Sequence, residues 1–369
     1  MTFYARTLCR GIRLLLYHLG PISCIGSAVE KQKSRERRFT PLKNLKLLSV
    51  ALAILGVMLA TLLVGWFGFG RITDAILSVG WRGFLLYAAW QVALFVLLGI
   101  AWWAVAPPAQ RRLPAFVWGR MVRDAAASCL PFSQLGGFIL GARAVALHGI
   151  AAPVATISTV VDLTAEFVAE ILFLVVGLVI LLAHGQTMSM TTPIAIGVGA
   201  AVIAGAVAMR LQRHTVPLFV HLSRRILGRW LLNGEDRQAV SEAELTAMYS
   251  HTGQIAAGTL LHLAGWFGKG AGNWIAFRLL GAPVDIGGAL AIEAVLHALL
   301  APAIVVPGYA GVQEAGYASL SALIGTTPEM SLAVSLLRRA RDLAVGVPIL
   351  LVWQFIEIRR LPRGTAKLQ

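Results

Sequence analysis

Long apolar stretches alternate with short polar or basic stretches along most of the chain. A helix needs about 20 predominantly apolar residues to cross the hydrocarbon core of a bilayer. The pattern therefore predicts an all-α polytopic membrane protein with six full spans. We expect these spans at residues 47–67, 84–106, 154–183, 193–209, 254–280 and 330–358.

Two further apolar stretches, 125–150 and 286–325, are interrupted by proline and glycine. The first contains L-P-F-S-Q-L-G-G-F-I-L-G-A-R-A, and the second contains A-P-A-I-V-V-P-G-Y-A-G-V-Q-E-A-G-Y. Proline removes a backbone donor and clashes with the preceding turn, so a helix that reaches it should break. We expect two re-entrant or broken hairpins, with breaks at Pro131, Gly136 and Gly137 in the first and at Pro307, Gly308 and Gly311 in the second.

Gln313 and Glu314 follow the break of the second stretch. A carboxylate at membrane depth costs about 2.5–3.5 kcal/mol on insertion scales, so Glu314 should face a partner or a water-filled cavity. One alternative is a loop between two short helices, with Glu314 at the membrane surface. We favour a hairpin that enters the membrane at a functional site, because non-helical backbone at that depth must be covered by protein or must line a cavity.

Basic residues gather between the expected spans. The chain has 32 Lys and Arg against 17 Asp and Glu, a net charge of +15, yet only 13% of its residues are charged. Basic loops stay on the cytoplasmic side of a membrane, so we expect loop 107–124 and both termini in the cytoplasm of a bacterium, with the spans in its inner membrane. No nucleic-acid partner is expected. Segment 210–237 interleaves arginine with apolar residues, which is typical of an amphipathic helix on anionic lipid.

The order span, span, hairpin, span occurs twice with opposite orientation, as in an inverted-topology repeat. Pro131 precedes Asp162 by the same interval that separates Pro307 from Arg338. We therefore divide the chain into a basic cytoplasmic extension (1–46), a transmembrane domain with halves at about 47–209 and 210–358, and a basic cytoplasmic tail (359–369).

Charged residues recur on one face of two expected spans. Asp162, Glu166 and Glu170 are four residues apart and so lie on one helix stripe. Arg338, Arg341 and Asp342 likewise share a face of the last span, whereas Arg339 should point elsewhere. Because charges at this depth need partners, we expect some of the arginines of this span to pair with the acidic stripe or with Glu314.

Glu293 and His297 are one helical turn apart in the first arm of the second hairpin. Metal binding would need further ligands that the spacing does not supply, so we expect a hydrogen bond that lines a polar cavity, with no metal and no cofactor. His262 and Lys269 should be satisfied polar residues that face the bundle. Gly99 should be a helix-packing position.

The two interrupted stretches resemble those of the lysylphosphatidylglycerol synthase transmembrane-region family, also called flippase-like membrane proteins, and most closely its branch associated with hopanoid biosynthesis. The resemblance covers about residues 47–358. In two-domain relatives the membrane part moves aminoacylated phospholipid between leaflets, and a C-terminal domain synthesises that lipid. This chain ends soon after its last span, so the resemblance implies no aminoacyl transfer. Many relatives carry a glutamate where this chain has Phe138.

The resemblance implies a lipid translocase or lipid-handling transporter, whose partner is a phospholipid or a hopanoid. One alternative is an intramembrane enzyme that acts on a polyprenyl or lipid diphosphate, although no nucleophile accompanies its candidate residues. Another is a non-transporting scaffold for lipid synthesis. No oligomeric state is predicted. The candidates for a headgroup path between the hairpins are Arg143, Glu166, Glu170, Glu293, His297, Gln313, Glu314, Arg338, Arg341 and Asp342.

Overall fold

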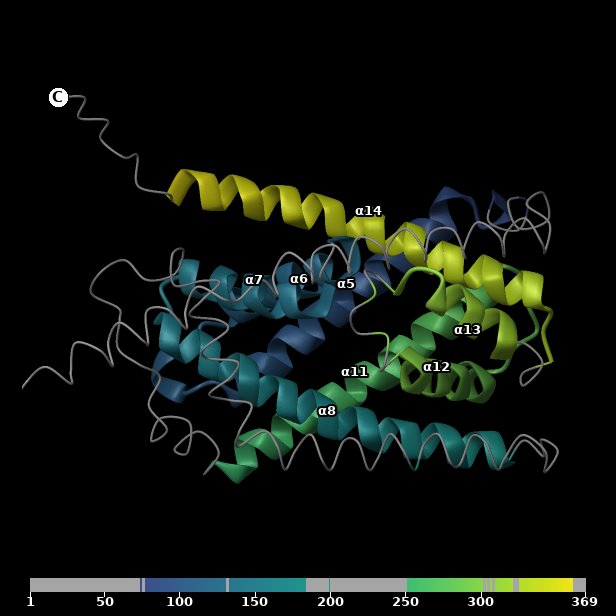
Figure 1. The fold of residues 1–369 in the computed structure, drawn as a ribbon, viewed down its shortest axis with the longest axis horizontal. Helices are drawn as coiled ribbons and strands as arrows, with labels where there is room; N and C mark the ends of the chain where they lie inside the picture. The colour runs from purple at the N-terminus through teal and green to yellow at the C-terminus, as the bar shows by residue number, and fades with distance from the viewer. Residues whose placement is uncertain are drawn as a thin grey trace, which may run out of the picture. The chain divides into compact units, whose positions relative to one another are not determined.

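The computed structural model of the chain describes residues 74, 77–130, 133–183, 199, 251–300, 303, 306, 309–320 and 325–360. The elements found there are helical (Figure 1). In chain order they are α5 (Gly80–Val105), the 3-10 helix η1 (Pro108–Gln110), α6 (Leu113–Cys129), α7 (Ser133–Leu147), α8 (Ala152–Ala183), α11 (Thr252–Leu279), α12 (Ile286–Leu300), α13 (Val312–Leu320) and α14 (Pro328–Arg360).

The long helices α5, α8, α11 and α14 coincide with four of the expected spans. Two of them, α5 and α8, are long and apolar enough to cross a membrane, with a mean hydropathy of 2.1 and 2.6 over their most apolar windows. Their outer faces expose large apolar side chains such as Leu86 and Val179, as a lipid-facing surface does. The other expected spans (47–67 and 193–209), the extension 1–46 and the amphipathic segment 210–237 lie outside the described residues.

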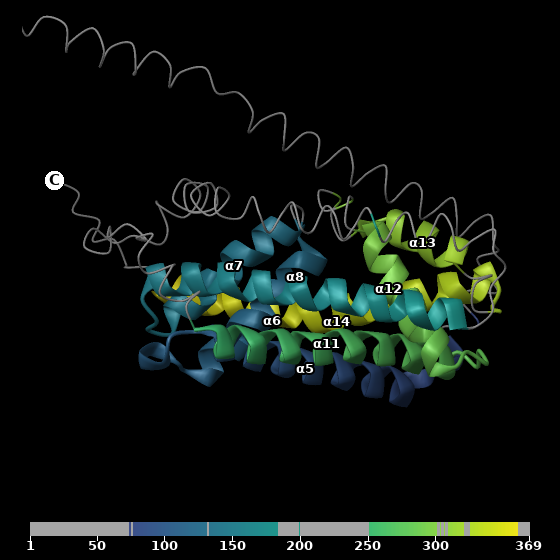
Figure 2. The ribbon, with the colours of Figure 1, turned by 90° about the horizontal axis from the view of Figure 1, so that it is seen from below.

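The long helices α5 and α11 run in opposite directions, and so do α8 and α14 (Figures 1 and 2). In α5 and α11 this follows from the contacts, because the position of Gly258 meets Val105 and that of Gly272 meets Trp90. Similarly, Leu181 near the end of α8 shares a buried cluster with Leu332 near the start of α14. The helices α8 and α11 run in the same direction, because Asp162 meets His262 and Glu166, one turn later, meets Trp266. Both α5 and α14 therefore run against them.

The first interrupted stretch forms a helical hairpin of α6 and α7. Its first arm begins at Leu113, so the expected loop 107–124 is wrong over most of its length. Pro114 lies in the first turn, where its missing N–H is not needed, and apolar side chains such as Phe116 and Val122 are fully buried. The basic residues Arg120 and Arg123 therefore belong to a buried helix and not to a loop. Only Arg111 and Arg112 remain in the connection.

Close backbone approach holds the two arms together. A Cβ atom on Gly137 of α7 would lie 2.5 Å from the carbonyl oxygen of Arg123 in α6. Gly136 and Gly137 both lie inside α7, so our expectation of helix breaks at these glycines needs correction, and Pro131 lies outside the described residues. Gly99 has the packing role expected of it, because a Cβ there would lie 2.5 Å from the Cα of Val117 in α6.

The second interrupted stretch holds α12 and α13. The Asp285 carboxylate accepts hydrogen bonds from the backbone N–H groups of Gly287 and Gly288, at 3.1 and 3.2 Å, and so caps the start of α12. Gly311 has a φ of 77° directly before α13, a backbone conformation that glycine adopts without strain. Pro307 and Gly308 lie outside the described residues. With 15 and 9 residues, the two arms are shorter than the about 20 residues of a full span.

The helices α5 and α11 interlock through glycines. Each glycine of α11 on this face leaves a notch that a side chain of α5 fills, and the indole N–H of Trp90 donates to the carbonyl of Gly268 at 2.9 Å. Small residues of this kind let membrane helices approach closely. The notches and the side chains within them are Gly258 with Val105, Gly265 with Leu98, Gly268 with Leu94 and Gly272 with Trp90.

Candidate functional site

A cavity of about 550 Å³ lies at the centre of the bundle. All the described α-helices contribute to its wall, and aromatic side chains such as Phe95, Phe138 and Trp266 line it beside charged ones. Its cationic lining residues are Arg120, Arg123, Lys269, Arg338, Arg339 and Arg341. Its acidic lining residues are Asp124, Glu166, Glu170 and Asp342.

Two helices present the same five-residue pattern to this cavity. The pattern R-x-x-R-D occurs as Arg120–Asp124 in α6 and as Arg338–Asp342 in α14. Positions i, i+3 and i+4 share one face of a helix, so each pattern places two guanidinium groups and a carboxylate together. The α6 copy was assigned to a cytoplasmic loop by its charge alone. The match between the two R-x-x-R-D patterns was the sequence feature that could have assigned the α6 residues to the site.

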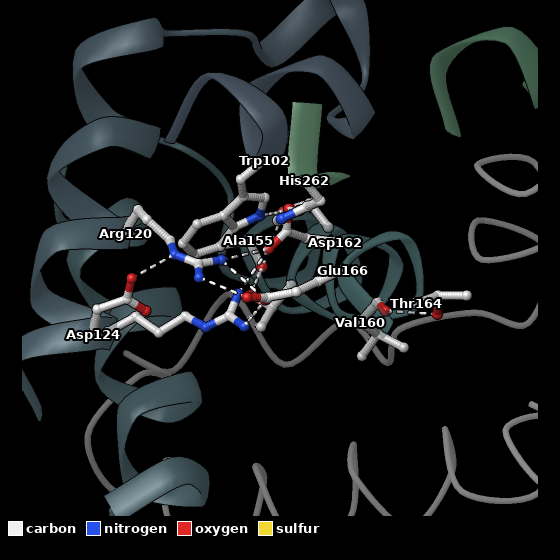
Figure 3. A network of polar contacts seen from close by, with 12 residues as sticks. Trp102, Arg120, Asp124, Ala155, Val160, Asp162, Thr164, Glu166 and His262 are labelled. Atoms are coloured by element: carbon white, nitrogen blue, oxygen red, sulfur yellow. Dashed lines mark hydrogen bonds and ion pairs between the residues drawn. The ribbon is translucent and has the colours of Figure 1, made fainter. Parts of the chain in front are cut away.

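The first charge cluster joins α6 to α8 (Figure 3). Arg120 donates two hydrogen bonds to Glu166, at 2.7 and 3.0 Å, and one to Asp124 at 2.8 Å. Arg123 donates to Asp162 at 2.7 Å and also to Glu166. The arginine side chains are only 2% and 4% exposed. Bidentate contacts of this kind are the strongest ion pairs that proteins form, so α6 is fixed to α8.

His262 of α11 completes the first cluster from behind. Its Nε2 lies 2.7 Å from Asp162 Oδ1, and both side chains are fully buried. His262 faces the bundle as expected, but it is only partly satisfied, because its buried Nδ1 has no hydrogen-bond partner among the described residues. The ligand atoms of Asp162, Glu166 and His262 lie within 4.8 Å of one another and form a group that could hold a metal ion. Both carboxylates already accept guanidinium hydrogen bonds, so an ion would have to displace Arg120 and Arg123.

The second charge cluster joins α14 to α12. Nη1 of Arg338 donates to both carboxylate oxygens of Glu293, at 2.7 and 2.9 Å, and to the hydroxyl of Tyr317 at 3.2 Å. That hydroxyl donates in turn to Asn273 Oδ1 at 2.9 Å. His297 Nδ1 lies 3.0 Å from the backbone oxygen of Glu293 and 3.4 Å from its carboxylate. Glu293 and His297 are thus neighbours, as expected, and His297 faces the cavity.

Glu314 is fully buried and has two partners. One carboxylate oxygen accepts from the backbone N–H of Gly311 at 2.8 Å, and the other accepts from Nε of Arg339 at 2.9 Å. Arg339 was expected to point away from the site, and this was wrong, because the residue after Arg338 on the helix faces α13. Gln313 beside it donates to the Ser335 hydroxyl at 3.0 Å, so both polar residues bind α13 to α14.

One of the expected pairings is present, because Arg339 of α14 binds Glu314. The expected pairing of α14 arginines with the acidic stripe is wrong, because Asp162 and Glu166 bind the arginines of α6 instead. Arg341 binds Asp342, its neighbour in the same helix, at 2.6 Å, and it also lies over the ring of Tyr87. The reason is topological, because α6 lies where the sequence had placed a loop.

Phe138 occupies the position of the first hairpin that corresponds to Glu314. It follows Pro131 by the same interval that separates Glu314 from Pro307. The guanidinium of Arg123 lies over its ring, 4.5 Å from the centroid. An aromatic face attracts a cation, so this hairpin retains a cationic contact where the second has an ion pair.

The structure gathers most of the predicted path residues but not all. Seven line the cavity, whereas Glu293 and Glu314 bind lining arginines from behind. Arg143 is absent from the lining, and it binds Glu357 of α14 at 2.9 Å. The seven lining residues are Glu166, Glu170, His297, Gln313, Arg338, Arg341 and Asp342.

Comparison with known proteins identifies the chain at the level of its family. Residues 49–349 match the family described as "Lysylphosphatidylglycerol synthase TM region". No curated protein and no solved structure matches the chain. The match covers most of the chain, including both hairpins and both charge clusters. This membrane protein therefore belongs to the lysylphosphatidylglycerol synthase transmembrane-region family.

Proposed function

We propose that the protein is a lipid translocase that passes the polar headgroup of a membrane lipid through its central cavity. The observation that carries this proposal is the cavity itself, whose wall is charged although the outer faces of α5 and α8 are apolar. A charge is expensive in the centre of a bilayer. A polar space enclosed by helices lowers that barrier for a headgroup, while the acyl chains stay outside in lipid.

The ion pairs around the cavity keep its wall polar while a carboxylate compensates the charge of each arginine. Arg338 and Arg339 each bind a fully buried carboxylate, of Glu293 and Glu314. Breaking a buried pair leaves an uncompensated charge, so the wall should stay intact while water and the headgroup exchange places. We therefore assign the clusters to the wall of the path, and we assign no catalytic step to them.

The chain order supports an inverted repeat around this path. Helix, hairpin and helix follow one another as α5, α6–α7 and α8, and again as α11, α12–α13 and α14. The opposite directions of corresponding helices are those that an inverted-topology repeat requires. We propose that the six spans and two re-entrant hairpins lie in a bacterial inner membrane with both termini in the cytoplasm.

A phospholipid or a hopanoid is the proposed cargo, and the link to hopanoids rests on the resemblance of the two interrupted stretches alone. Anionic lipid is the proposed partner of segment 210–237. The rival function is hydrolysis of a lipid diphosphate, for which the specific observation is the group Asp162, Glu166 and His262. Its two carboxylates are bound to arginine in this structure, which favours transport.

The test is reconstitution of the purified full chain into vesicles that contain a tail-labelled fluorescent phospholipid. Dithionite bleaches only label in the outer leaflet, so a translocase should extend the bleaching beyond that fraction. Gln91→Trp fills the cavity and should slow movement, whereas Val92→Trp, on the exposed side of the same helix, should not. Bleaching equal to that of protein-free vesicles would contradict the proposal. Release of phosphate from a lipid diphosphate with Mg²⁺ would favour the enzyme.

A further inference from the structure

We infer that the cavity selects a zwitterionic headgroup, with an anionic phosphate bound by Lys269 and a primary ammonium bound by Glu170. The inference names the class of ligand for the site, and its meaning for transport rests on the proposed function. It starts from two charged side chains of the cavity wall, Glu170 and Lys269. Lys269 was expected to be a satisfied polar residue, and this needs correction, because its ammonium contacts the Trp266 ring but forms no ion pair in the described part of the chain.

The other charged lining residues take part in ion pairs. Those of α6 and α8 belong to the first cluster, and those of α14 bind Glu293, Glu314 or Asp342. In the described part of the chain, Lys269 and Glu170 form neither an ion pair nor a hydrogen bond with another side chain, although both line the cavity. Their charges are therefore available to a ligand.

An aromatic ring holds Lys269 in place. Its Nζ lies 3.6 Å from the centroid of the Trp266 ring, a cation–π contact that leaves the ammonium N–H groups free to donate. Trp266 is itself fixed, because its ring stacks on Phe173 at 5.8 Å and meets His297 edge-on at 4.5 Å. The amine is thus supported from one side, as a binding group must be.

Helix register places the two charges at the same level. The indole N–H of Trp266 in α11 donates to the backbone oxygen of Glu166 in α8, at 3.4 Å. The two helices run in the same direction, and one helical turn is about 3.6 residues. Lys269 lies about one turn beyond Trp266, and Glu170 lies about one turn beyond Glu166. The two residues therefore lie at the same level along their helices, and both face the cavity. They do not form an ion pair with each other.

A cation and an anion that share a cavity without pairing favour a ligand that carries both charges. A purely anionic headgroup would satisfy Lys269 but would leave Glu170 opposed to a like charge. The first cluster holds three carboxylates, Asp124 on α6 and Asp162 and Glu166 on α8, against two arginines. This excess of negative charge repels an anion from that side of the cavity. A phosphate joined to an ammonium by a short linker would satisfy both groups with charge-assisted hydrogen bonds.

Binding of soluble headgroups to the detergent-purified full chain tests this directly. The probe is glycerophosphoethanolamine, and glycerophosphoglycerol and inorganic phosphate are the probes without an ammonium, all measured by isothermal titration calorimetry. A hydrogen bond between charged groups corresponds to a preference of about tenfold for the ethanolamine probe. Glu170→Gln should remove that preference and Glu170→Asp should retain most of it. Lys269→Gln should weaken binding of both glycerophosphodiesters.

Two matched controls separate the site from general loss of charge. Arg278→Gln removes another α11 cation that lies over a tryptophan ring, Trp274, and Glu329→Gln removes a carboxylate of α14; neither residue lines the cavity. Both controls should bind as the wild type does. Thermal unfolding of each variant checks that it is folded.

Equal affinity of the wild type for both glycerophosphodiesters would overturn the inference, as would absence of binding to folded protein or a preference that survives Glu170→Gln. Failure of the transport proposal would look different. Lipid would then remain in its leaflet in the vesicle assay, while the preference for the ethanolamine probe and its loss in Glu170→Gln persisted.

Discussion

Arg338 and Glu293 join α14 to α12 through two hydrogen bonds from a single guanidinium nitrogen, at 2.7 and 2.9 Å. The carboxylate of Glu293 is fully buried. Removing one partner of a buried ion pair leaves the other charge uncompensated and costs about 3–5 kcal/mol. Arg338→Gln and Glu293→Gln should therefore each lower the thermal stability in detergent, and the double variant should recover part of the loss.

Arg341→Gln is the matched control for this pair. Arg341 binds Asp342 in its own helix, and that carboxylate is 24% exposed. Arg341→Gln should therefore lower the unfolding temperature less than Arg338→Gln does. Losses from Arg338→Gln and Glu293→Gln that simply add in the double variant would show that the two residues are not coupled.

A second prediction concerns the partner of Glu166. Its carboxylate binds Arg120 with two hydrogen bonds, whereas Arg341 has another partner. Glu166→Gln and Arg120→Gln should show a coupling of about 0.5–3 kcal/mol in a double-mutant cycle, which is the range for residues in contact. The cycle of Glu166→Gln with Arg341→Gln should be additive. The reverse outcome in thermal unfolding would restore the pairing that the sequence alone suggested.

The spans could be predicted because a long apolar run is compatible with few structures other than a membrane-spanning helix. The expected spans 154–183 and 330–358 differ from α8 and α14 by at most two residues at each end. The charge partners were not predictable, since they depend on which helix lies beside a given face. The buried arginines of α6 sit in a basic segment between two spans, which is the usual composition of a cytoplasmic loop. Only the repeated R-x-x-R-D pattern distinguished them from loop residues.

Two adjacent glycines of α7 should respond in opposite ways to the same substitution. A Cβ on Gly137 would lie 2.5 Å from the backbone oxygen of Arg123, whereas nothing lies within 4 Å of a Cβ on Gly136. Gly137→Ala should therefore separate the arms of the first hairpin and lower the unfolding temperature. Gly136→Ala should be neutral or stabilising by about 0.5–1 kcal/mol, because alanine favours the helix. Equal effects of both changes would contradict the packing of α6 on α7.

Glu314→Gln tests the second hairpin. The amide keeps one acceptor for Arg339, but its NH₂ group would face the backbone N–H of Gly311, which now donates to the carboxylate. Loss of this buried hydrogen bond should reduce stability by about 1–3 kcal/mol. Lipid movement in vesicles should fall as well, because Arg339 faces the cavity. Gln313→Glu retains the size of the neighbouring side chain and serves as a comparison. Normal stability and normal movement in Glu314→Gln would show that neither contact matters.

The proposed topology predicts which loops can be labelled from outside. Loop 184–192, between the expected spans 154–183 and 193–209, is nearly uncharged and is expected outside. In a background without native cysteines, Ser189→Cys in this loop should react with a membrane-impermeant maleimide in cells with a permeabilised outer membrane. Ser223→Cys should react only after the inner membrane is opened, because the surrounding basic segment is expected in the cytoplasm. Labelling at position 223 from outside would invert the topology.

The interlocked glycines of α11 restrict how the bundle can move. Sliding α11 along α5 by one residue, a step of about 1.5 Å, would bring side chains of α11 against Leu94 and Leu98, which now fill the notches of Gly268 and Gly265. We therefore expect α5 and α11 to keep their relative position. Any opening of the proposed path should then move other helices relative to this pair, and not α5 relative to α11.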